Sequence, residues 1–118
     1  MKYMLLIYLE ETAITEEERE HCYVESNEVA ADLQAKGQFL GANPLQPVST
    51  ATSVRVREGK RLVTDGPFAE TREYLGGYFL INAPNLDEAI SIAGRIPAAR
   101  FGTVEIRPII EIPGLPAN

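Results

Sequence analysis

The stretch "GGYFLINAPNLDEAISIAGRI", residues 76–96, decides the fold because it reads as a strand followed by a helix. From Gly77 to Ala83 it is apolar at successive positions, which predicts a strand with two apolar faces. Asn85 is a preferred N-cap residue and Glu88 follows three positions later, a signature of a helix start. Five apolar residues then recur at helical spacing and are predicted to form one inward face: Leu86, Ala89, Ile90, Ala93 and Ile96.

The first third of the chain has the same order of strand and helix. Residues 1–9, "MKYMLLIYL", predict another strand that is apolar on both faces. "TEEE" from Thr15 is a capping box, so a helix is predicted from Glu16 to Lys36, ending at Gly37. Its predicted inward stripe consists of Cys22, Ser26, Val29 and Leu33, with Ala30 alongside.

The remaining segments complete an α+β order. "GQFLGANPLQP", residues 37–47, predicts a short strand, and "ATSVRVREGKRLVT", residues 51–64, predicts a hairpin with one wet face. "TVEIRPII", residues 103–110, predicts the last strand, and residues 111–118 form a proline-rich tail. Two interleaved β-α-β units with right-handed crossovers predict a ferredoxin-like plait with an inserted β-hairpin and both helices on one sheet face.

That arrangement leaves one sheet face without a helix. The strands at residues 1–9 and 77–83 are apolar on both faces, so the uncovered face would be a large exposed apolar patch on a monomer. A second subunit is the economical cover. We therefore expect a two-fold homodimer packed sheet to sheet.

Composition places the chain among ordinary globular proteins. Its 118 residues, 45% hydrophobic and 24% charged, predict a single domain over residues 1–118. The apolar run near the N-terminus is too short for a signal peptide or a membrane span, and one cysteine suits a reducing compartment, so a cytoplasmic protein without membrane contact is expected. The net charge of −6, without clustered lysine and arginine, argues against direct nucleic-acid binding.

A family resemblance rests on "DGPFAET" (residues 65–71), "LGGY" (75–78) and "PAARFG" followed by "VEIRP" (97–108). With these motifs the chain resembles the YCII-related proteins of the DGPF group, up to about Ile110. The resemblance implies a dimeric α+β barrel of ferredoxin-like subunits. It also implies a link to sigma factors, because some relatives are associated with them, and suspected enzymatic activity, because YCII relatives have a histidine and an aspartate in a cleft. That histidine would fall near Ser26 in this chain.

Asp65 is the main candidate for a chemical role. At a strand end, beside a glycine, its carboxylate could act as general acid or base or bind a polar ligand group. In the alternative interpretation Asp65, Gly66 and Pro67 simply build a turn. Gly66, Pro67 and Phe68 would border a ligand in the first case.

Other candidate residues follow from charge. Arg72 and Arg100 could bind an anionic ligand through paired donors, although local salt bridges on a solvated surface explain Arg72 as well. His21, the sole imidazole, lies on the flank of the first predicted helix and is a second catalytic candidate or a plain surface residue. Cys22 fits a core position better than a nucleophile.

Two functions stay open on this basis. One is a dimeric module that binds a small molecule or a sigma-factor-related protein. The other is a small enzyme that uses Asp65 as general acid or base in a cleft near the dimer interface. No cofactor motif is present, and one histidine with one cysteine does not make a metal site, so neither cofactor nor metal is expected.

Overall fold

The structure is a computed structural model that describes residues 1–116. The strands are β1 (Lys2–Leu9), β2 (Phe39–Pro44), β3 (Thr52–Arg57), β4 (Lys60–Asp65), β5 (Tyr74–Asn82) and β6 (Thr103–Pro108). The helices are α1 (Glu16–Ala35) and α2 (Leu86–Arg95), with short 3-10 helices η1 (Val48–Thr50) and η2 (Pro97–Arg100). This α+β order is the predicted one, and only β5 begins clearly earlier than expected. The last two residues of the predicted tail lie outside the described residues.

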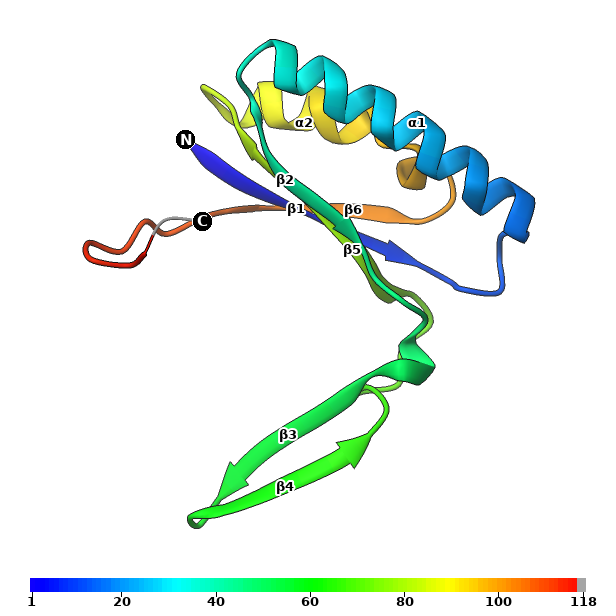
Figure 1. The fold of residues 1–118 in the computed structure, drawn as a ribbon, viewed down its shortest axis with the longest axis vertical. Coiled ribbons are helices and arrows are strands. Elements are labelled where there is room, and N and C mark those ends of the chain that lie inside the picture. The colour runs from blue at the N-terminus through cyan, green and yellow to red at the C-terminus, as the bar shows by residue number, and fades with distance from the viewer. Residues whose placement is uncertain (117–118) are drawn as a thin grey trace.

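Four strands form one antiparallel sheet in the order β2-β5-β1-β6 (Figure 1). Leu5 in the middle of β1 pairs with Phe79 of β5 on one side and with Ile106 of β6 on the other. The two outer strands are those that follow β1 and β5 through a helix. The order is therefore that of two interleaved β-α-β units, as predicted.

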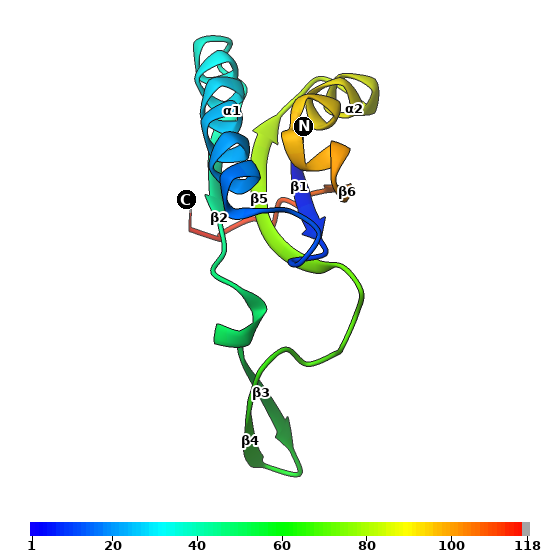
Figure 2. The ribbon, with the colours of Figure 1, turned by 90° about the vertical axis from the view of Figure 1, so that its right-hand side faces the viewer.

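Both helices lie on one side of this sheet, with the core between (Figures 1 and 2). Tyr3 and Leu5 of β1 are buried there together with their cross-strand partners in β5. Tyr3 pairs with Ile81, and Leu5 pairs with Phe79. The buried positions of the helices contribute Val29, Leu33, Ala89, Ile92 and Ala93. The other side, here called the open sheet face, carries Met4, Leu6, Tyr8, Tyr78 and Leu80.

The helix ends have the predicted chemistry. Thr15 Oγ1 accepts a hydrogen bond from the Glu18 backbone N–H at 3.1 Å, and Glu18 Oε1 accepts one from the Thr15 N–H at 2.8 Å, which completes the capping box. Asn85 Oδ1 accepts from the Glu88 N–H at 2.9 Å at the start of α2. After α1 the backbone turns through Gly37 at φ 71°, a left-handed conformation that glycine adopts without strain.

The predicted inward face of α2 is wrong in two positions. Leu86 and Ile90 are each 51% exposed, whereas Ile92, which was not assigned to that face, is only 2% exposed. Apolar residues at six of the eleven positions from 86 to 96 form two overlapping stripes, and the packing of α2 on β6 and η2 selects the stripe through Ile92. Ala89, Ala93 and Ile96 are buried as predicted.

Strands β3 and β4 form a separate two-stranded hairpin that projects from the rest of the molecule (Figures 1 and 2). Residues 52–65 are called the arm from here on. Its turn consists of Glu58 and Gly59, both at positive φ, 51° and 74°, as in a two-residue type I′ turn. The hairpin was predicted and is present. The prediction that only one of its faces is exposed to water is wrong for a single chain, because apolar residues on both faces of the arm are exposed.

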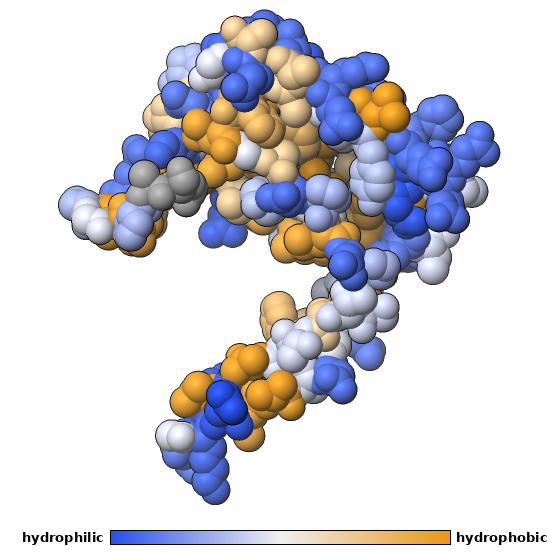
Figure 3. Space-filling model, viewed as in Figure 1, coloured by the Kyte–Doolittle hydropathy of each residue, from blue (hydrophilic) through white to orange (hydrophobic). Residues whose placement is uncertain are grey.

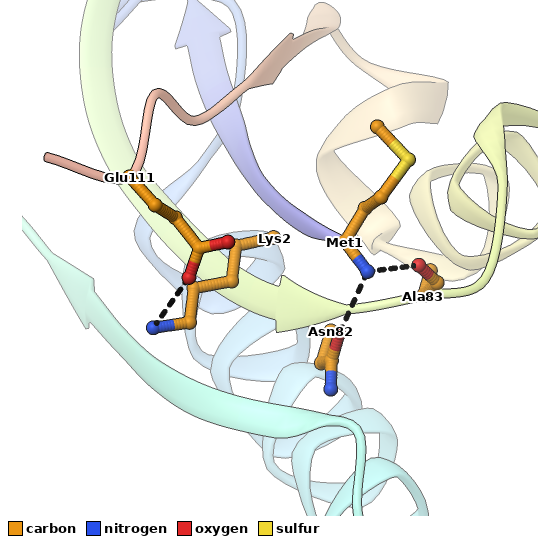
Figure 4. A network of polar contacts seen from close by, with 5 residues as sticks. All are labelled: Met1, Lys2, Asn82, Ala83 and Glu111. Atoms are coloured by element: carbon orange, nitrogen blue, oxygen red, sulfur yellow. Dashed lines mark hydrogen bonds and ion pairs between the residues drawn. The ribbon is translucent and has the colours of Figure 1, made fainter. Parts of the chain in front are cut away.

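The end of the sheet opposite the arm is fastened by the first residues of the chain (Figure 4). The Met1 amine donates to Asn82 Oδ1 at 3.2 Å and to the Ala83 carbonyl at 3.0 Å. The neighbouring Lys2 ammonium lies 3.4 Å from a Glu111 carboxylate oxygen, which joins the start of β1 to the segment after β6. These contacts join the start of β1 to the end of β5 and to the segment after β6 at that end of the sheet.

Candidate functional site

A groove of about 710 Å³ lies between the first half of α1 and the sheet, at the end nearest the arm. One wall is the inward stripe of α1, where Cys22 and Ser26 are half-buried and face open space rather than core. The other walls come from the ends of β1, β2 and β5 and from the segment around η2. The apolar lining residues include Ile7, Leu9, Ile14, Ala30, Phe39, Ala42, Phe79, Ile96, Ala98 and Phe101.

Small residues create this space. Ser26 and Ala30 on α1 face Ala42 and the Gly76-Gly77 pair across the groove. A Cβ atom at Gly77 would lie 2.9 Å from the Asn43 carbonyl oxygen and 3.2 Å from the Pro44 Cα, so close packing of β2 on β5 requires glycine there. At Gly76 the nearest atoms to a Cβ would be Leu9 Cδ1 at 3.8 Å and the Ile7 oxygen at 3.9 Å, which is ordinary contact.

The charged residues of the lining are already engaged by the protein. Glu11 Oε2 accepts a hydrogen bond from the Val48 backbone N–H at 2.7 Å. The Arg19 guanidinium donates through Nη2 to the Glu11 carbonyl at 3.3 Å. The groove therefore combines an apolar interior with two charged side chains, Glu11 and Arg19, each held at the wall by one backbone group.

Arg100 lies close to the groove but is tied to α1. Its Nη1 and Nη2 donate to Glu25 Oε2 and Oε1 at 3.1 and 2.8 Å, a bidentate pair. The hydrogen bond from Arg100 holds the pKa of the Glu25 carboxyl below its usual value, with the positive charge adding to the effect. The guanidinium carbon also lies 5.9 Å from the centre of the Phe101 ring. The predicted anion-binding arginine thus serves as a bridge between η2 and α1.

Cys22 is a neutral thiol on the groove wall. Burial raises its pKa, although nearby Arg100 opposes the shift, so the thiolate that a nucleophile needs is disfavoured. Sequence reasoning placed Cys22 on the inward stripe of the helix, and the structure agrees. Its surroundings differ from a core position, because the thiol lies half-buried beside the groove.

The DGPF residues lie away from the groove, at the root of the arm. Asp65 ends β4 opposite Thr52 and is exposed. Gly66 adopts φ 97°, donates its N–H to the Ala51 carbonyl at 2.7 Å and accepts from Ser53 Oγ at 2.8 Å. Phe68 is 80% exposed. Within the described chain this corner has the hydrogen bonding of a turn, and the Asp65 carboxylate has no partner among the hydrogen bonds and ion pairs found in residues 1–116.

The remaining candidates are also separate from the groove. His21 is exposed on α1. The Arg72 side chain is 89% exposed, and its Nε lies 3.9 Å from Glu10 Oε2, which is a loose surface pair. The candidate residues therefore do not form one cluster within a single chain. Sequence reasoning missed the groove itself, although its signal was present as small residues on the inward stripe of one helix and on one strand.

Two features of residues 1–116 bear on wider roles. In residues 1–116 no helix is long and apolar enough to cross a membrane. The same part of the chain holds no group of three or more histidine, cysteine and acidic side chains placed to bind a metal ion.

The fold and the groove define a small α+β protein with an antiparallel sheet, two helices on one face and an inserted hairpin. The model of the YCII-related domain matches residues 1–113. An uncharacterised protein of Rhizobium meliloti (strain 1021) is 34% identical over 114 aligned residues, and the match covers 92% of this chain and 92% of that protein. The chain therefore belongs to the YCII-related family.

Proposed function

We propose that this protein binds a small, neutral and largely apolar molecule in the groove between α1 and the sheet. The observation that carries the proposal is the groove itself. Its volume of about 710 Å³ lies in the range of small-molecule sites, and it combines an apolar interior with a few polar groups at the edge. A largely apolar ligand is favoured because most of the lining side chains are apolar, while Glu11 and Arg19 are each held by a backbone group and Arg100 is paired with Glu25.

The working unit that we propose is a homodimer of ferredoxin-like subunits. The sheet order fits the plait, and the open sheet face presents the half-buried Met4, Leu6, Tyr8 and Tyr78 side by side on the two central strands. Packing two such faces together would remove them from water and would produce the dimeric α+β barrel that the family resemblance implies.

Ligand binding is favoured over the two other expected roles for a structural reason. A role for Asp65 as general acid or base in the groove would need its carboxylate there, but within one chain it lies on the arm. The sigma-factor-linked role rests on the family resemblance alone. The groove, in contrast, supplies a defined volume and lining.

The proposal is tested by filling the groove. N-phenyl-1-naphthylamine, a neutral apolar dye, is expected to bind the wild-type protein with increased fluorescence. Ser26→Phe places a ring into the groove and should weaken dye binding at least about 10-fold, since it removes volume and apolar contact area. Ser91→Phe is the matched control, because Ser91 is exposed on α2 away from the groove.

A second readout uses Cys22, the only cysteine of the chain and part of the groove wall. Bound dye should slow the alkylation of Cys22 by a maleimide in the wild-type protein. Equal dye affinity of the Ser26→Phe and Ser91→Phe proteins, or alkylation at the same rate with and without dye, would contradict the assignment of the site.

A further inference from the structure

The two charged side chains of the groove lie at the same end of it, where helix α1 begins. Arg19 lies about one turn before Cys22 and two turns before Ser26, on the stripe of α1 that forms the groove wall. Glu11 belongs to the loop between β1 and α1 and also lines the groove. Figure 3 shows hydrophilic side chains gathered where α1 begins in Figure 1. The two charges therefore mark one end of a groove whose interior is apolar.

The guanidinium and the carboxylate lie near each other without forming an ion pair. Arg19 Nη2 donates to the backbone carbonyl of Glu11 at 3.3 Å, which brings the guanidinium next to the residue that carries the carboxylate. The Glu11 carboxylate itself accepts through Oε2 from the Val48 backbone N–H at 2.7 Å. Among the ion pairs of residues 1–116 none joins these two side chains. Two opposite charges are thus held apart at the groove wall.

Each of these two groups has hydrogen-bonding capacity left. A guanidinium carries several N–H donors, and a carboxylate has a second acceptor oxygen. Within residues 1–116 the Arg19 side chain makes only the hydrogen bond to the Glu11 carbonyl, and Glu11 Oε1 makes none. Both side chains are half-buried, so a ligand that fills the groove would take water away from them. That loss is costly unless the ligand supplies hydrogen bonds in return.

We propose that the apolar ligand carries a neutral group with adjacent C=O and N–H, as in a carboxamide, and that this group bridges Arg19 and Glu11. Its carbonyl oxygen accepts from the Arg19 guanidinium, and its N–H donates to Glu11 Oε1. A neutral group suits the pair because the two charges sum to zero, whereas Glu11 would repel a carboxylate and Arg19 would repel an ammonium group. The inference rests on the proposed function and adds the polar end of the ligand to it.

Compounds of nearly equal size test the polar end of the ligand. Naphthalene is substituted at the same ring position with a carboxamide, a methyl ketone, which lacks the N–H, or a carboxylate. Displacement of N-phenyl-1-naphthylamine from the wild-type protein measures the affinity of each compound. The amide should bind at least about 10-fold more tightly than the ketone, as for a hydrogen bond to a charged group, and more tightly than the carboxylate.

Two substitutions test which residue contacts which atom of the ligand. Arg19→Met removes the donor and should weaken both the amide and the ketone at least about 10-fold, because both present a carbonyl oxygen. Glu11→Gln keeps an oxygen for the Val48 N–H but turns an N–H toward the ligand, so it should weaken the amide and not the ketone. Arg72→Met is the matched control, because Arg72 is exposed and lies outside the groove.

Three results would overturn the inference. They are an amide that binds the wild-type protein no better than the ketone, a carboxylate that binds best, and equal weakening of the ketone by Arg19→Met and Glu11→Gln. Binding of the dye by each variant checks that its groove is intact, and if a variant loses the groove, the wild-type ranking of the three compounds still decides. Failure of the wild-type protein to bind the dye would refute the proposed function as well, so the two failures are distinguished.

Discussion

Two adjacent glycines of β5 should respond in opposite ways to the same substitution. In Gly77→Ala the new Cβ atom would lie 2.9 Å from the Asn43 carbonyl oxygen and 3.2 Å from the Pro44 Cα. Both are backbone atoms of β2, so relief requires a shift of a paired strand by roughly half an ångström rather than a side-chain rotation. Overpacking of this kind costs about 1–3 kcal/mol of unfolding free energy.

Gly76→Ala is the control, because its Cβ atom would make only ordinary contacts at 3.8 and 3.9 Å and Gly76 does not adopt a positive φ. Lower entropy of the unfolded chain then gives about 0.4–1 kcal/mol of stabilisation. Urea denaturation followed by circular dichroism measures both values. We expect the two variants to differ by at least about 1.4 kcal/mol, the sum of the two lower bounds. Equal stabilities would refute the explanation of Gly77 by close strand packing.

Two further predictions concern the helices. The melting temperature of wild type should exceed that of Glu25→Gln near neutral pH. The pKa of Glu25 is lowered in the folded state from its ordinary 4.5, so the difference in melting temperature has its full size above pH 4.5. It shrinks as the pH falls through the lowered pKa. A difference that persists at a pH where the Glu25 carboxyl is protonated would point to packing instead. Ile92→Ala should cost about 2–5 kcal/mol in urea denaturation, while Ile90→Ala, its exposed neighbour on α2, should cost less than about 1 kcal/mol. A larger loss of stability in Ile90→Ala than in Ile92→Ala would instead support the inward face of α2 that was predicted from the sequence.

The elements were predictable from sequence where local chemistry determines them. Thr15 with Glu18, and Asn85 with Glu88, mark both helix starts within a few residues, and the structure has these hydrogen bonds. The order of strands and helices then leaves few possible sheets. The wrong inward face of α2 arose because two apolar stripes overlap there, and only tertiary packing selects one.

The groove could not be predicted in the same way, because its walls come from segments far apart in the sequence. Ser26 was assigned to an inward stripe, which holds, and Gly77 is required by the close packing of β2 on β5. Their combination as an open space depends on how far α1 stands from the sheet, which no local pattern reports. Asp65 differs from the groove residues in that its motif is conspicuous in the sequence. The structure nevertheless places it at the root of the arm and outside the groove.

The irregularity in the pairing of β1 with β5 has a consequence for chain length. Ile7 pairs with Gly77 but Tyr8 pairs with Leu75, so Gly76 is an extra residue in β5. A protein that lacks this one residue could keep every other pair in register, with Tyr74 still beside the groove. Relatives of this chain can therefore differ by one residue at this point without exchanging the faces of the strand, whereas a deletion two residues further along would turn the buried Phe79 outward.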